Sequence, residues 1–146
     1  MIKIAAVHPD IIWPERVRLG APRLNAEWLE LFNAGSTPVN IHRFFVANKR
    51  GDGFTLSLPR TNKLLVGAYQ SLLVFSGRPD NPEDPALCYL ATQSNRVFLK
   101  RQGYFWDPVE DTAYLYTSRD DFLTDPKSFV DLYHYKRRSA KIVIPT

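Results

Sequence analysis

The chain has 146 residues, of which 45% are hydrophobic, 13% aromatic and 23% charged, with a formal net charge of +4. This length suits one domain, and so many apolar and aromatic residues exclude a disordered chain. No apolar run approaches the roughly 18 residues of a membrane-spanning helix, and the apolar N-terminal stretch is too short for a signal peptide. We therefore expect one soluble domain over residues 1–146, in the cytoplasm or elsewhere inside the cell.

Short apolar runs, separated by turn-forming residues, follow one another along most of the chain. In chain order they cover residues 2–7, 27–32, 39–46, 54–58, 64–66, 69–75, 97–99 and 112–117. Gly, Pro, Asn and Asp lie between them, and residues 48–53 are typical of a hairpin turn. This pattern predicts an all-β fold, an immunoglobulin-like β-sandwich of seven to eight strands.

The end of the chain follows a different pattern. Ser118 and Asp121 indicate a capping-box-like turn. Asp125–Pro126 suits the N-cap and first position of a helix. The apolar residues with i, i+3, i+4 spacing are Phe129, Leu132 and Tyr133. We therefore expect a short C-terminal helix over 126–138, rather than a strand, and a last short strand at 142–144.

Residues 27–41 have the sequence Glu-Trp-Leu-Glu-Leu-Phe-Asn-Ala-Gly-Ser-Thr-Pro-Val-Asn-Ile. This block resembles the opening strand and turn of the lamin-tail domain family. Residues 72–77 and 97–99 are similar to two later strands of that family, so the resemblance spans roughly residues 2–118. It implies an immunoglobulin-like β-sandwich whose members act mostly in binding rather than in catalysis.

A carboxylate stands between two aromatic residues on one face of the run over 27–32. Period-two geometry places Glu30 beside Trp28 and Phe32, and places Glu27 on the opposite face. Either Glu30 is a structural carboxylate with a partner inside the fold, or its face is open and binds something. We favour the structural role. The residues expected to be structural are Trp28, Glu30, Asn33 and Gly35.

The residue types that carry catalysis or bind metals form no known motif. Cys88 is the single cysteine, so no internal disulfide can form, and its apolar neighbours predict a core position. The three histidines lack the spacing of metal ligands. Nucleophile motifs and phosphate-binding glycine loops are absent. We therefore expect no catalytic residue, no metal and no cofactor.

Two regions are candidates for binding a partner. Residues 1–126 carry equal numbers of acidic and basic residues, so the whole positive excess lies in 127–146. The basic residues Lys136, Arg137, Arg138 and Lys141 are the candidate nucleic-acid site, since cations neutralise phosphates and the nearby tyrosines can stack on bases.

In the loop over 9–25, three consecutive apolar residues either plug the end of the sandwich or contact a partner. They are Ile11, Ile12 and Trp13.

These observations favour a non-catalytic protein-interaction or binding module of lamin-tail type. The alternative is nucleic-acid binding through the basic C-terminal element. We expect a protein partner, with nucleic acid as the alternative, and no membrane partner. The oligomeric state is left open.

Overall fold

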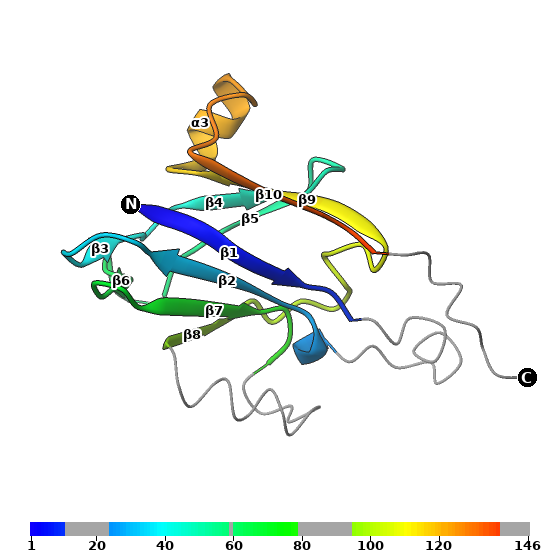
Figure 1. Ribbon diagram of the computed structural model, residues 1–146, viewed down its shortest axis with the longest axis horizontal. Helices are drawn as coiled ribbons and strands as arrows, with labels where there is room; N and C mark the ends of the chain where they lie inside the picture. The colour runs from blue at the N-terminus through cyan, green and yellow to red at the C-terminus, as the bar shows by residue number, and fades with distance from the viewer. Residues whose placement is uncertain (11–23, 59, 79–94, 138–146) are drawn as a thin grey trace, which may run out of the picture.

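The computed structural model in Figure 1 describes residues 1–10, 24–58, 60–78 and 95–137. In chain order its elements are β1 (Ile2–His8), the 3-10 turn η1 (Leu24–Ala26), β2 (Trp28–Asn33), β3 (Val39–Asn40), β4 (Phe45–Ala47), β5 (Gly53–Thr55), β6 (Leu65–Val66), β7 (Ser71–Phe75), β8 (Asn95–Phe98), β9 (Glu110–Tyr116), the helix α3 (Arg119–Thr124) and β10 (Asp131–Lys136). The expected all-β sandwich is confirmed.

Two four-stranded sheets face each other and enclose the core (Figure 1). One sheet has the order β1-β2-β7-β8 and the other β10-β9-β4-β5, while β3 and β6 form a separate two-stranded ribbon. The pairs are antiparallel except for β7 with β8. Because alternate side chains of each strand point inward, apolar residues of both sheets meet between them. The buried ones include Leu29, Leu31, Val46, Leu72 and Leu115.

The expected helix over 126–138 is wrong, because residues Asp131–Lys136 of this segment form strand β10. It pairs antiparallel with β9 over its whole length, from Asp131 to Lys136. Tyr133 and Tyr135 turn toward the core, whereas Leu132 stays 44% exposed. Pairing along the edge of β9 satisfies the backbone and buries two tyrosines, so it overrides the helix-like spacing. The expected strand at 142–144 lies outside the described residues.

The short helix lies before that segment. Ser118 is the N-cap of α3, and its hydroxyl accepts a hydrogen bond from the N–H of Asp121, which confirms the capping-box-like turn. Asp125, expected at the start of a helix, is instead the C-cap of α3. Rings from α3 and from the turn after it cover the outer face of β4 and β9. Phe122 of α3 and Phe129 of the turn pack on Phe45 of β4 and on Tyr114 and Tyr116 of β9.

The apolar run over 39–46 forms two strands rather than one. The backbone turns at Arg43, whose φ of 71° lies in the left-handed region. The chain thereby leaves the ribbon of β3 and β6, and β4 joins the sheet that contains β9, β10 and β5. The expected hairpin turn at 48–53 is confirmed, since the N–H of Asn48 donates to the carbonyl of Asp52. The divided run and β10 explain why the described residues form ten strands instead of the expected seven or eight.

Candidate functional site

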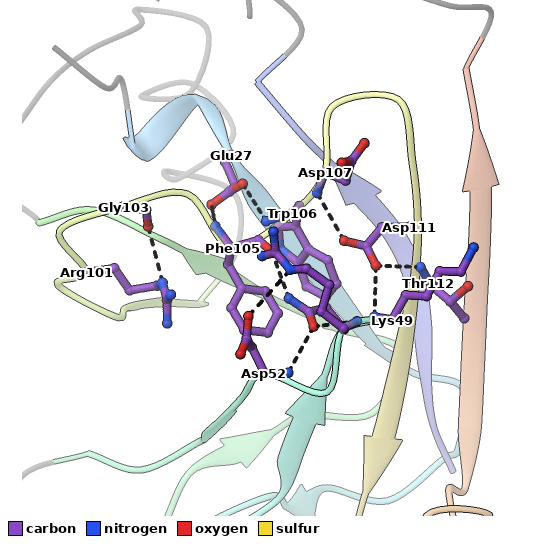
Figure 2. Close-up of polar contacts among 12 residues, drawn as sticks. Glu27, Lys49, Asp52, Arg101, Gly103, Phe105, Trp106, Asp107, Asp111 and Thr112 are labelled. Atoms are coloured by element: carbon purple, nitrogen blue, oxygen red, sulfur yellow. Dashed lines mark hydrogen bonds and ion pairs between the residues drawn. The ribbon is translucent and has the colours of Figure 1, made fainter. Parts of the chain in front are cut away.

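A buried network of carboxylates and amides joins β2, β9 and the hairpin between β4 and β5 (Figure 2). Glu27, just before β2, is 0% exposed. Its two carboxylate oxygens accept hydrogen bonds from the N–H groups of Phe105 and Trp106, each at 2.8 Å. The structural carboxylate of this region is therefore Glu27, on the face opposite Glu30. Its charge is tolerated because backbone donors replace the water that burial removes.

Two further buried side chains hold the same end of the sheet together. Asp111 accepts hydrogen bonds from the N–H groups of Lys49, Asp107 and Thr112 at 2.8 to 3.0 Å. Asn48 donates to the carbonyl of Phe105 at 3.0 Å. Each of these bonds is to the backbone, so this network anchors the loop that enters β9 rather than presenting groups to a ligand.

Glu30, expected to be the buried charge, is only half-buried. It accepts a hydrogen bond from the hydroxyl of Ser71 at 2.5 Å on the neighbouring strand β7. Trp28 on the same face stacks on the ring of His8, with 5.0 Å between ring centroids. These contacts are with neighbouring strands of one sheet, as expected for residues that stabilise the sheet.

The other two residues expected to be structural form a turn after β2. Asn33 is buried, and its side-chain amide donates to the carbonyls of Thr37 and Val66 at 2.8 and 3.1 Å. Its Oδ1 accepts from the N–H of Gly35 at 2.9 Å. Asn33 thus ties the chain after β2 to strand β6.

The basic C-terminal element is described only in part. Lys136 is exposed at the end of β10, directly opposite Glu110 of β9. The backbone N–H of Arg137 donates to the carbonyl of Val109 at 2.7 Å. The remaining predicted binding residues lie outside the described residues: Arg138, Lys141, Ile11, Ile12 and Trp13. The same holds for Cys88.

A groove of about 570 Å³ lies at the other end of strands β4, β5 and β9. Three segments that are far apart in the sequence line it: the turn before β4, the chain that follows β5, and the start of α3. The lining residues are His42, Arg43, Thr55, Ser57, Leu58, Arg60, Thr61, Ser118, Arg119 and Asp120. We call this the arginine groove.

The fold holds each wall of the arginine groove in place. The N–H of Arg43 donates to the carbonyl of Leu56, and the N–H of Leu56 donates to the carbonyl of Phe44, both at 2.7 Å. The buried side chain of Leu56 turns the neighbouring Thr55 and Ser57 outward. On the far wall, packing of the Phe122 ring on Phe45, 5.1 Å between centroids, fixes α3 on the sheet.

The charge of the arginine groove is strongly positive. It contains three arginines and one aspartate, which leaves an excess of two positive charges when His42 is neutral. Within the described parts of the chain, no ion pair engages the guanidinium groups of Arg43, Arg60 or Arg119. Arginine stays charged at all physiological pH values and presents a planar fork of donors that matches phosphate and carboxylate oxygens. The groove can therefore bind an anion.

Sequence reasoning missed the arginine groove. Each arginine stands alone in a polar turn or at a helix start, and nothing in the local pattern links one to another. The available signal was weak: Arg43 and Arg60 occupy turn segments, and Arg119 follows the helix-capping Ser118. Only the pairing of β4 with both β5 and β9 brings the three segments together.

No protein-family model matches the chain, and no curated protein matches it. The resemblance to the lamin-tail family therefore stays a prediction. Within the described residues, no helix has the length and apolar character needed to span a membrane.

Proposed function

We propose that this chain is a non-catalytic binding module on a lamin-tail-like β-sandwich, and that its arginine groove recognises an anionic group of a partner protein. The observation that carries the proposal is that three arginines from distant segments line one groove. An intracellular location belongs to the same proposal and stays a prediction.

The scaffold around the arginine groove supports a binding role. The sheet of β9, β4 and β5 and an aromatic cluster anchor its walls, whereas most of the lining side chains come from turns and from the start of a helix. Proteins commonly place binding residues on connecting segments that a rigid framework positions. Arg43, Arg60 and Arg119 form no ion pair with the residues that the structure describes, so their donors are available to an incoming anion.

The test compares two variants that lose the same charge. One variant carries Arg43→Gln, Arg60→Gln and Arg119→Gln. The control carries Lys3→Gln, Arg96→Gln and Lys127→Gln, which are exposed basic residues that do not line the groove. Backbone amide NMR spectra are recorded while sodium phosphate replaces sodium chloride at constant ionic strength.

We expect saturable shifts at the groove residues in the parent chain and in the control, and their loss in the groove variant. Shifts spread evenly over the surface, or equal shifts in both variants, would refute recognition at this groove. Melting temperatures of both variants show whether the substitutions leave the fold intact.

Nucleic-acid binding through Lys136, Arg137, Arg138 and Lys141 is the second candidate. The exposure of Lys136 where the chain leaves the sheet favours it. Against it, Glu110 lies opposite Lys136 and offsets part of that charge.

A further inference from the structure

We infer that the arginine groove takes a phosphate monoester carried by an extended peptide, that is, a phosphoserine or phosphothreonine segment of a partner protein. The inference rests on the proposed function and names the ligand class of the same groove. Charge, size and the open edge of strand β5 support it.

The charge balance of the arginine groove fits a dianion better than a single carboxylate. Its excess of two positive charges equals the charge that a phosphate monoester approaches at neutral pH, about −1.5 to −2. One carboxylate is satisfied by one arginine fork, whereas a phosphate can accept from several arginines through its three free oxygens. A groove lined by three arginines therefore suits a phosphate monoester better than a single carboxylate.

The size of the groove calls for more than a free ion. Its volume of about 570 Å³ lies within the range of roughly 300–1,000 Å³ that is usual for organic ligands. A phosphate ion fills only a small part of that space. The remaining lining offers hydroxyl groups and one apolar side chain, Leu58, which suit a peptide around the phosphate.

An open strand edge borders the groove. Strand β5 ends its sheet within the described residues. Leu56 directs its N–H and carbonyl toward the β4 side, as its bonds with Phe44 and Arg43 show. Backbone groups alternate in direction along a strand, so Thr55 of β5 directs its N–H and carbonyl away from β4. Thr55 and the nearby Ser57 also line the groove, so a peptide pairing with this edge would run beside the arginines.

The lining favours a peptide over a nucleic acid. The described residues that form the groove include no Phe, Tyr or Trp on which bases could stack. A nucleic acid also has no extended peptide backbone to pair with the outward N–H and carbonyl of Thr55. A peptide supplies both the phosphate and a backbone that can pair with the edge of β5.

The experiment measures fluorescence anisotropy of the full chain with labelled nine-residue peptide pools. One pool has a central phosphoserine, the second has serine at that position, and a 20-nucleotide oligo-dT is the third probe. We expect the phosphoserine pool to bind at least roughly tenfold more tightly than the serine pool, as hydrogen bonds to a charged group imply. The preference should vanish in the variant with Arg43→Gln, Arg60→Gln and Arg119→Gln, and persist in the Lys3, Arg96 and Lys127 control.

The role of the strand edge is tested separately with Thr55→Pro. Proline removes the outward N–H of residue 55 without removing a bond to β4, and an edge strand tolerates it. We expect this variant to lose affinity for the phosphoserine pool while inorganic phosphate still shifts the groove residues, and Thr55→Ala to keep both. If Thr55→Pro fails to fold, a phosphoserine pool with N-methylated residues beside the phosphoserine tests the same hydrogen bonds on the parent chain.

The outcomes separate this inference from the proposed function. If inorganic phosphate shifts the groove residues but the phosphoserine pool binds no better than the serine pool, the inference fails and the proposed function stands. If neither phosphate nor peptide binds at the groove, both fail. Tighter binding of oligo-dT, abolished by the three groove substitutions, would replace the peptide with a nucleic acid.

Discussion

The backbone N–H of Ile4 donates a hydrogen bond to the carboxylate of Asp131 at 2.7 Å, across 127 positions of sequence. Ile4 lies in β1, the end strand of one sheet, and Asp131 begins β10, the end strand of the other. Figure 1 shows these two strands side by side. The side chain of Asp131 thus accepts the hydrogen bond of a backbone N–H group at the edge of β1. Without this bond, the N–H group of Ile4 would be available to pair with another strand.

We predict that Asp131→Ala lowers the free energy of unfolding by about 1–3 kcal/mol, because the N–H of Ile4 loses a charged partner. Urea denaturation followed by circular dichroism measures the change. Asp52→Ala is the control, since within the described residues the side chain of Asp52 forms only an exposed pair with Arg50 at 3.4 Å, and such pairs contribute little. An equal loss of stability in both variants would contradict the role assigned to Asp131.

We predict that Glu27→Ala destabilises the chain far more than Glu30→Ala does. Removing Glu27 leaves the buried N–H groups of Phe105 and Trp106 without an acceptor, at about 1–3 kcal/mol each. Glu30 loses one bond with Ser71 in a half-buried setting, so its substitution should cost about 1 kcal/mol. Urea denaturation followed by the fluorescence of the tryptophans ranks the two variants, and the reverse ranking would refute this assignment.

The exposed pair between Lys49 and Glu110, 2.6 Å apart, predicts a coupled titration. The hydrogen bond with Glu110 raises the pKa of Lys49, and the same bond lowers the pKa of Glu110. The stabilisation from Glu110 is therefore present above the ordinary pKa of the carboxyl and is lost as pH falls through the lowered value. The stabilisation from Lys49 is lost as pH rises through its raised value. We expect Lys49→Gln to raise the pKa of Glu110, and a carbon-detected NMR titration measures this change. An unchanged pKa of Glu110 would show that the pair does not persist in solution.

The half-buried side chain of Tyr135 predicts a loss of stability in alkali. It donates to the carbonyl of Asp107 at 2.5 Å, and burial raises the pKa of Tyr135 far above its ordinary value of 10.0. Only the unfolded chain ionises this group at moderate alkaline pH, so stability is full below about pH 10 and falls as pH rises further. We expect Tyr135→Phe to flatten this decline in urea denaturation series above pH 10. An equally steep decline in the variant would assign the alkaline effect to other groups.

The nucleic-acid alternative predicts salt-dependent retention of a duplex in gel-shift experiments. Replacing Lys136, Arg137 and Arg138 with Glu should abolish that retention, because each contact with a phosphate releases a counterion when it forms. Retention that persists in this variant would show that the C-terminal element is not the site. A variant with Arg43→Glu, Arg60→Glu and Arg119→Glu is the matched control, since it makes the same change of charge on a different part of the surface.

Local pattern was enough for most of the framework. The alternation of Leu29 and Leu31 with their half-buried neighbours marks β2 as a strand, because side chains of a strand point alternately to its two faces. The capping pair Ser118 and Asp121 likewise marks the start of α3, since the hydroxyl bonds an N–H only three residues away. Such features involve neighbours in sequence, so sequence alone can show them.

Tertiary structure decided the features that depend on distant partners. A helix would fit the spacing of Phe129, Leu132 and Tyr133, but pairing with the edge of β9 makes residues 131–136 a strand. The sequence indicated Glu30 as the structural carboxylate, whereas the N–H groups of Phe105 and Trp106 bind Glu27 in the folded chain. The sequence by itself thus determined a β-sandwich with alternating apolar strands. The arginine groove forms only when the pairing of β4 with β5 and β9 brings Arg43, Arg60 and Arg119 to the same end of the sheet. Long-range hydrogen bonds and burial set the positions of these segments, whereas local sequence preference does not.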